Sequence, residues 1–119
     1  MILYRQRRMA QAQDKRVSKL TGLKIQINSG AVNGRKGDLY GKHILVETKT
    51  SSQPKKTISV KRLWLDEISS KAFSMGKRFW ALVIGDELTK EDFVIMPLDL
   101  FDTLCNSYDQ EMMLNEDKS

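Results

Sequence analysis

The chain has 119 residues, of which 40% are hydrophobic and 29% charged. This length and composition predict one globular domain and exclude two separate hydrophobic cores. The formal charge of +5 conceals a division along the chain. Residues 1–85 carry 18 Lys or Arg and five Asp or Glu, a charge of +13, whereas residues 86–119 carry two Lys and ten acids, a charge of −8. A basic body indicates a polyanionic partner, with nucleic acid the first candidate; the alternative is a basic protein without such a partner.

Cysteine and histidine are too scarce for several classes of chemistry. Cys105 is the only cysteine, which excludes an intrachain disulfide and favours a reducing compartment. Cysteine catalysis is not expected, because the only histidine, His43, falls in a predicted turn. The apolar start is too short for a signal peptide, and no run approaches the roughly 20 apolar residues that span a bilayer. We therefore expect a cytoplasmic protein without a membrane partner.

The first predicted elements are a helix and a strand. Residues 4–20 lack Gly and Pro and have loosely helical apolar spacing, and Gly22 ends this helix. Its single acid, Asp14, lies among six bases, so it is either an intrahelical pairing partner or a functional group. Residues 23–28 alternate apolar and polar side chains and predict a half-buried strand. The loop of residues 29–35 is not a phosphate loop, because no Gly-Lys-Ser/Thr follows it.

Residues 36–49 predict a β-hairpin that carries acidic side chains. With Gly41-Lys42 as a two-residue turn, Tyr40 faces His43 and Asp38 faces Leu45. Alternation then places Asp38, Glu47 and Lys49 on one face, with the two acids diagonal at about 7–8 Å between backbones. A four-residue loop keeps this face, and a three-residue loop breaks it. Two carboxylates and a lysine suggest a site for a hard metal ion; the alternative is a solvated sheet edge.

The second half completes a mixed sheet flanked by helices. A polar loop over residues 50–57 precedes a helix over residues 59–75. Its predicted buried face consists of Val60, Leu63, Trp64, Ile68 and Ala72. Residues 79–84 predict a central strand, residues 85–87 a turn, residues 93–96 a further strand and residues 98–104 a short helix. The predicted order is α-β-β-β-α-β-β-α, an α/β fold, with a single domain over residues 1–105 and an acidic, flexible tail over residues 106–119.

This pattern resembles the PD-(D/E)xK nuclease superfamily, which has the restriction-endonuclease-like fold. Within it, the chain is most similar to the archaeal-type Holliday junction resolvases and their phage and bacterial relatives. Four segments within residues 14–84 carry the resemblance: Asp14-Lys15-Arg16-Val17, Asn28-Ser29-Gly30-Ala31, Lys36-Gly37-Asp38 and Val46-Glu47-Thr48-Lys49-Thr50. Two departures are Asp14, where the family usually has Glu, and Gly37, where the motif has Pro.

The resemblance implies metal-assisted hydrolysis of phosphodiester bonds in DNA. Asp38, Glu47 and the main-chain carbonyl of Thr48 would ligate Mg²⁺, for which Mn²⁺ would substitute, and a metal-activated water would attack the phosphate. Lys49 would orient that water and offset charge in the transition state. Asp14 would hold a water in the second coordination shell, and Ser29 would contact the scissile phosphate. The expected phosphate-binding residues are Arg35, Lys36, Lys55, Lys56, Lys61 and Arg62.

The expected activity is therefore a structure-selective endonuclease, most similar to a Holliday junction resolvase in DNA recombination and repair. The alternatives are a nickase or a repair or phage nuclease acting on ordinary duplex, and a non-catalytic nucleic-acid-binding module. A four-way junction is two-fold symmetric and needs two opposed cuts, so we expect a homodimer. The predicted helix over residues 59–75 offers Trp64, Leu65 and Phe73 as apolar material for the interface.

Overall fold

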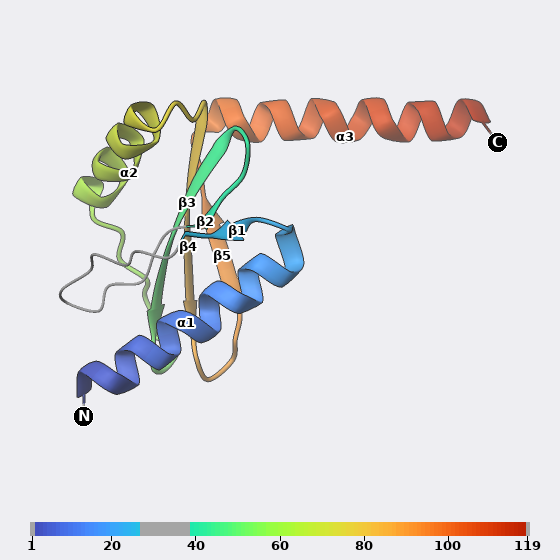
Figure 1. Ribbon diagram of the computed structural model, residues 1–119. Helices are drawn as coiled ribbons and strands as arrows, with labels where there is room; N and C mark the ends of the chain where they lie inside the picture. The colour runs from blue at the N-terminus through green and yellow to red at the C-terminus, as the bar shows by residue number, and fades with distance from the viewer. Residues whose placement is uncertain (1, 27–38, 119) are drawn as a thin grey trace.

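The computed structural model describes residues 2–26 and 39–118. Three helices and five strands follow one another as α1 (Ile2–Thr21), β1 (Lys24–Ile25), β2 (Leu39–Tyr40), β3 (Ile44–Ser51), α2 (Arg62–Ser74), β4 (Phe79–Asp86), β5 (Asp92–Ile95) and α3 (Leu98–Lys118) (Figure 1). This order confirms the predicted mixed α/β arrangement. No helix in the described part of the chain is long and apolar enough to cross a membrane.

The strands form one mixed sheet in the order β1-β2-β3-β4-β5. β3 and β4 are parallel and pair along all eight residues, whereas the other neighbours are antiparallel. A parallel pair needs a crossover connection, which α2 supplies. The predicted central position of residues 79–84 is confirmed, because β4 has a partner on each side and Ala81, Leu82 and Val83 are buried.

The β2–β3 hairpin has a different register from the predicted one. Tyr40 pairs with Leu45 and Leu39 with Val46, so the register is shifted by two residues from the predicted one, and the predicted pairing of Tyr40 with His43 is wrong. The hairpin closes where the amide of Gly41 donates to the carbonyl of Ile44, at 2.9 Å. Because the shift is an even number of residues, the assignment of side chains to faces is the same in the two registers. Asp38 itself lies outside the described residues.

Alternate residues of β3 pack into two separate apolar clusters. Leu45 contacts Ile68 and Ala72 of α2, and Val46 lies with Val17 of α1 on the other side. Because successive side chains of a strand point to opposite faces, α1 and α2 cover opposite faces of the sheet. The odd-numbered residues of β3 therefore face α2, and the even-numbered residues face α1.

Helix α2 is shorter than predicted, and its buried face is narrower. It begins at Arg62 instead of residue 59, and only Ile68 and Ala72 are buried. The predicted burial of Leu63 is wrong, since 61% of this residue is exposed. Leu63 is five positions before Ile68, about 140° around the helix, so it cannot share the face defined by Ile68 and Ala72.

Two predicted boundaries near the C-terminus are also corrected. The predicted turn over residues 85–87 begins later, because Gly85 and Asp86 belong to β4 and Gly85 pairs with Asp92. The predicted short helix continues to Lys118 as the 21-residue α3, which extends away from the sheet (Figure 1). Residues 98–118 contain no Gly or Pro to stop a helix. The predicted flexibility of residues 106–119 stays a prediction.

The lack of a side chain at Gly85 allows β5 to pair closely with β4, and this gives a testable prediction. A Cβ built there overlaps the carboxylate of Asp92 and lies 2.7 Å from the carbonyl oxygen of Glu91. Gly85→Ala should lower the free energy of unfolding by about 1–3 kcal/mol, because main chain has to move. Gly41→Ala is the control, since its Cβ meets only side chains, at 3.0 and 3.3 Å. Urea unfolding measures both; an equal loss in the two variants would contradict the prediction.

Candidate active site

Glu47 and Lys49 lie together on the face of β3 that is turned toward α2. Lys49 Nζ is 3.9 Å from Glu47 Oε1, and the two side chains are 36% and 28% exposed, respectively. Their neighbours on β4 are Leu82 and Ile84, of which Leu82 is fully buried. The pair therefore emerges from an apolar part of the sheet and remains accessible to solvent. The structure thus brings these two predicted site residues together.

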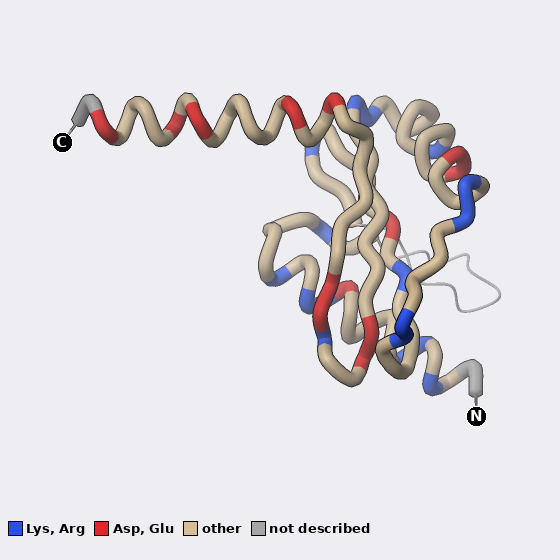
Figure 2. The backbone as a smooth tube through the Cα atoms, turned by 180° about the vertical axis from the view of Figure 1, so that it is seen from behind, with Lys and Arg blue, Asp and Glu red and all other residues tan. Residues whose placement is uncertain are grey.

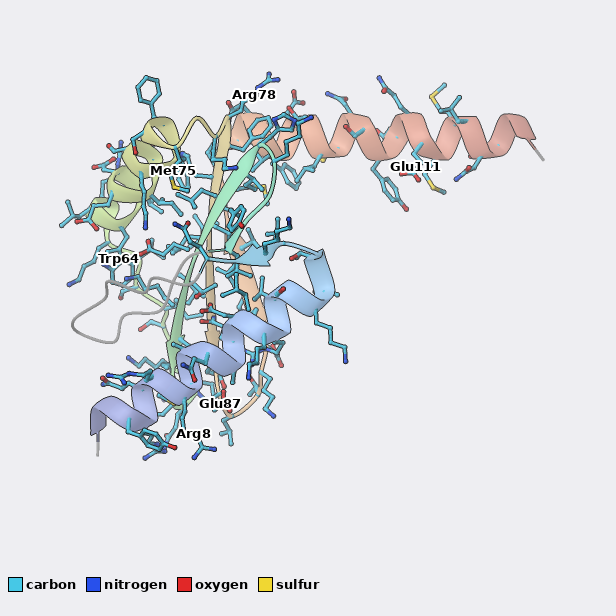
Figure 3. All side chains as sticks on the ribbon, viewed as in Figure 1. Arg8, Trp64, Met75, Arg78, Glu87 and Glu111 are labelled. Carbon is cyan, nitrogen blue, oxygen red and sulfur yellow. The ribbon has the colours of Figure 1, made fainter. Side chains whose placement is uncertain are left out.

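Trp64 fixes the position of the Lys49 ammonium from the other side. Lys49 Nζ lies 4.9 Å from the centre of the Trp64 ring, and Lys61 Nζ lies 5.7 Å from it. Figure 3 shows Trp64 at the start of α2, to one side of the strands. A lysine over an indole face gains electrostatic attraction without forming an ion pair. Trp64, predicted on the buried face of its helix, is half-buried and also contacts Lys49.

Lys49 and Trp64 line a groove of 740 Å³ at the ends of β3 and β4. Its lining includes Lys55 and most of its neighbours in residues 50–59, the acids Asp86 and Glu91, and Phe93 of β5. Phe93 pairs with Ile84 and is 54% exposed, so part of this lining is apolar. The groove therefore combines two lysines and two acids with apolar side chains.

Asp14 lies on the other face of the sheet. Its carboxylate accepts a hydrogen bond from the Thr48 hydroxyl at 2.5 Å, and both residues are buried. Thr48 points toward α1, whereas Glu47 and Lys49 point toward α2, so the structure does not bring Asp14 to the same face as Glu47. This contact joins α1 to β3. Asp14 holds the strand from behind the Glu47–Lys49 pair.

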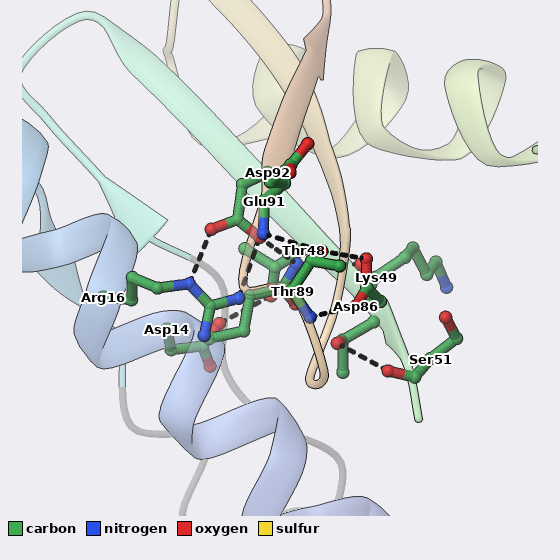
Figure 4. Close-up of polar contacts among 11 residues, drawn as sticks. Asp14, Arg16, Thr48, Lys49, Ser51, Asp86, Thr89, Glu91 and Asp92 are labelled. Carbon is green, nitrogen blue, oxygen red and sulfur yellow. Dashed lines mark hydrogen bonds and ion pairs between the residues drawn. The ribbon is translucent and has the colours of Figure 1, made fainter. Parts of the chain in front are cut away.

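A second set of polar contacts joins α1 to β3 and β5 (Figure 4). The Gln13 amide donates to the carbonyl of Lys49 at 2.8 Å and to Asp92 Oδ1 at 3.2 Å. Arg16 donates to both oxygens of Asp92, at 2.7 and 2.9 Å, and this contact raises the pKa of Arg16. Gln13 is fully buried, and its Oε1 has no hydrogen-bond partner among the described residues. Gln13 therefore holds the main chain at Lys49, and Asp14 holds the side chain of Thr48.

Sequence reasoning missed Gln13, Arg16 and Asp92. A signal for Gln13 was present: it lies four residues before Val17, on the apolar stripe of α1, where a polar side chain needs a buried partner. Asp92 carried no comparable signal, because it lies among several acids near a turn. Its role depends on its pairing opposite Gly85, which only the folded sheet defines.

The remaining predicted residues fall into two groups. Lys55, Lys56, Lys61 and Arg62 are exposed along the segment that enters α2. Arg62 forms an exposed ion pair with Asp66 at 3.2 Å, one turn further along the helix. Four predicted residues lie outside the described part of the chain: Ser29, Arg35, Lys36 and Asp38.

The described residues contain no group of three or more His, Cys, Asp and Glu that could hold a metal ion. On the α2 face of β3 they provide the Glu47 carboxylate, and the main chain provides the Thr48 carbonyl. Oxygen atoms of this kind are the ligands that Mg²⁺ prefers, so the donor type fits. The second predicted carboxylate ligand is Asp38, which is not among the described residues.

Comparisons with known proteins gave no relative: no protein-family model, curated protein or solved structure matches this chain.

The Thr48–Asp14 hydrogen bond predicts a specific loss of stability. Thr48→Val keeps the shape of the side chain but removes the hydroxyl that donates to a buried carboxylate. The free energy of unfolding should fall by about 1–3 kcal/mol, the usual cost of leaving a buried polar group short of a partner. Thr48→Ser, which keeps the hydroxyl, should lose clearly less. Chemical denaturation compares the two, and equal stability of Thr48→Val and the parent protein would contradict the interpretation.

The turn after β4 predicts a pH dependence. The Thr89 hydroxyl and amide donate to the Asp86 carboxylate at 2.6 and 2.7 Å, and these hydrogen bonds lower the pKa of Asp86. A lowered pKa adds stability above the pKa of the unfolded chain, about 4, and this contribution disappears as pH falls through the folded pKa. Thr89→Val should therefore raise the pKa of Asp86 and reduce stability at neutral pH but not in strong acid.

Carboxyl NMR titration measures the pKa, and urea unfolding from neutral to strongly acidic pH measures the stability difference. Thr57→Val, in the exposed loop before α2, is the control. A stability difference between Thr89→Val and the parent protein that is constant over this pH range would contradict the prediction.

Proposed function

We propose that this protein is a Mg²⁺-dependent DNA endonuclease of the PD-(D/E)xK type that acts on branched DNA, most similar to a Holliday junction resolvase. The observation that carries the proposal is the half-exposed Glu47–Lys49 pair on one face of β3, at 3.9 Å. A Glu-x-Lys spacing places both groups on the same side of a strand, where a carboxylate can bind a cation and an ammonium can face an anion. The β2–β3 hairpin beside the pair is the local structure that this motif requires.

The fold supports the proposal at the level of architecture. A helix precedes an antiparallel hairpin, and β3 then pairs in parallel with β4 through the crossover helix α2. The motif-bearing strand is therefore central in the sheet and fixed along its whole length. We infer the restriction-endonuclease-like fold from this order together with the position of Glu47 and Lys49 within it.

In the proposed site, Glu47, the Thr48 carbonyl and Asp38 of the predicted motif hold the metal ion. A bound Mg²⁺ supplies Lewis-acid stabilisation of the phosphate and a nucleophile at neutral pH. The protein contributes position: from the opposite face, Asp14 holds the Thr48 hydroxyl and Gln13 holds the carbonyl of Lys49. These two contacts fix residues 48 and 49 of β3 on either side of the peptide bond that joins them.

Lys49 contributes positive charge at the place where a phosphate would gain negative charge. Its ammonium lies between the Glu47 carboxylate and the Trp64 ring. The ring holds this charge without neutralising it, so Lys49 remains able to donate to an anionic oxygen. Loss of Lys49 should therefore affect the rate of cleavage much more than the binding of DNA.

The basic residues near the Glu47–Lys49 pair indicate the class of substrate. Lys55 lines the same groove as Lys49, and Lys56, Lys61 and Arg62 are exposed on the segment next to it. Such residues bind phosphates without reading the base sequence. Recognition of DNA shape is therefore favoured over recognition of sequence. Two opposed cuts in a symmetric junction require two copies of the site, so the working unit is proposed to be a homodimer.

The test compares a synthetic four-way junction with linear duplex of the same arms, at equal concentration and with Mg²⁺. The proposal expects paired cuts in the junction and slow cleavage of the duplex. Nicking of both substrates at equal rates would support the nickase alternative. Binding without cleavage under any divalent cation would support a non-catalytic module, and full cleavage in excess EDTA would exclude the metal site.

Variants of the motif should separate cleavage from binding. Glu47→Gln, Asp38→Asn and Lys49→Ala should each lower single-turnover cleavage of the junction by about 100-fold or more, the size of effect seen when one electrostatic catalytic group is removed. Junction affinity, measured by electrophoretic mobility shift in Ca²⁺, should change less than about threefold, because separate lysines and arginines bind the phosphates. Glu67→Gln on the exposed side of α2 is the matched control. Near-normal cleavage by Glu47→Gln would remove this residue from the site.

A further inference from the structure

Helix α3 is a large surface that the proposed nuclease site does not use. Of its described side chains, only Leu100 is buried, and those of residues 101–116 are all exposed. Most of the helix extends beyond the sheet, with Glu111 on the extended part (Figure 3). Most of the stability of a helix in a protein comes from the packing of its apolar face, so the stability of α3 depends on what packs against it.

One side of α3 has the pattern of a packing surface. Apolar side chains recur at intervals of three and four residues, the spacing of a helix seam. They are Leu98, Phe101, Cys105, Tyr108 and Met112. Phe101 and Tyr108 are 54% and 64% exposed. An exposed apolar stripe of this length is unusual for a monomer and indicates a contact surface.

Acidic residues run beside this stripe. Asp102, Asp109 and Glu116 follow one another at intervals of seven residues, which places them in one line about 10 Å apart. The whole helix has six acids and one lysine, a formal charge of −5. Pairing of α3 with α3 of another copy would bring these lines of like charge together, which is unfavourable. The preferred partner is therefore a basic surface.

Such a surface exists on α1 of the same chain. Helix α1 has six bases and one acid, a formal charge of +5. Five positions of α1 repeat at intervals of three and four residues, on the side opposite the buried Gln13 and Val17. Four of them are bases and one is alanine: Arg5, Arg8, Ala12, Lys15 and Lys19. Figure 2 shows the basic residues along α1 and the acidic residues along α3, at separate parts of the molecule. Arg8 and Lys15 have the same seven-residue interval as Asp102 and Asp109.

We propose that α3 of one copy packs along the basic outer side of α1 of a second copy, and that the exchange is reciprocal. Reciprocal contacts satisfy a two-fold axis and form a closed dimer. Each copy would contribute faces of one 20-residue and one 21-residue helix, comparable to the roughly 20–30 residues per side of a stable interface. Phe101 and Tyr108 would lie on arginine side chains, as Arg8 already does on Tyr4 at 5.8 Å.

The docking surface is separate from the phosphate-binding residues of the proposed nuclease, none of which lies on α1. The dimer is measured without DNA, so its failure and the failure of the proposed activity are distinguishable. It also differs from the interface first expected on α2, where Phe73 is exposed but Trp64 and Leu65 are half-buried.

Charge exchange tests the proposal, with the full-length chain in sedimentation equilibrium from low to high micromolar concentration. Arg8→Glu/Lys15→Glu and Asp102→Arg/Asp109→Arg should each raise the dimer dissociation constant at least about tenfold, because several opposed charges are lost. The four substitutions together should restore it to within about threefold. Raising NaCl from about 50 to 500 mM should weaken the dimer of the parent protein. Lys42→Glu/Lys90→Glu, which has the same change in charge at exposed loop positions, is the control and should leave the dimer intact.

Three results would overturn the proposal. One is a monomer at every concentration. Another is an unchanged dimer in Arg8→Glu/Lys15→Glu, which would show that the basic side of α1 is not part of the interface. The third is failure of the four-fold variant to recover affinity while circular dichroism shows its helices intact, which would place the interface on another surface.

Discussion

The alternation of side chains along β3 is the constraint on which the rest of the structure depends. This strand is covered by α1 on one face and by α2 on the other, so each successive residue has a different task. Thr48 is buried against Asp14, whereas Glu47 and Lys49 open toward the groove. A shift of one residue in pairing would bury two charges and expose the Thr48 hydroxyl, which is costly on both sides. The apolar contacts of Leu45 and Val46 oppose such a shift.

Polar contacts between α1 and the sheet fix the orientation of this helix where few apolar side chains pack. β5 has only four residues and forms one edge of the sheet, but Asp92 receives hydrogen bonds from both Gln13 and Arg16. The half-buried Arg16 guanidinium and Asp92 carboxylate form two hydrogen bonds, and this pairing orients α1 against β5. Gln13 also donates to the carbonyl of Lys49, so the position of α1 is transmitted directly to the strand that bears the candidate site. Such directional contacts specify an orientation that aliphatic packing alone leaves loose.

The uneven charge of the chain has two structural consequences. Basic residues at the groove and at the start of α2 surround the Glu47–Lys49 pair, which suits a polyanion. Basic residues on α1 form a separate stripe, and the acids of α3 are kept away from both by the direction in which that helix leaves the sheet. An acidic helix near the groove would repel the same polyanion that the lysines attract. The separation of α3 from the groove is therefore consistent with nucleic-acid binding there and with a protein contact elsewhere.

The sequence by itself determined the order of the elements, the central position of residues 79–84 and the common face of Glu47 and Lys49. These features follow from local periodicity, because side chains alternate between the two faces of every strand in a sheet. It did not determine that Tyr40 pairs with Leu45, because two registers that differ by two residues satisfy the same alternation. The acidic composition of residues 106–119 favoured a flexible tail, although the absence of Gly and Pro from residues 98–118 allows one continuous helix. Only the tertiary structure decided that Asp14 lies behind the sheet and that Gln13, Arg16 and Asp92 meet, since contacts between residues that are 34 or more positions apart depend on how α1 crosses the sheet.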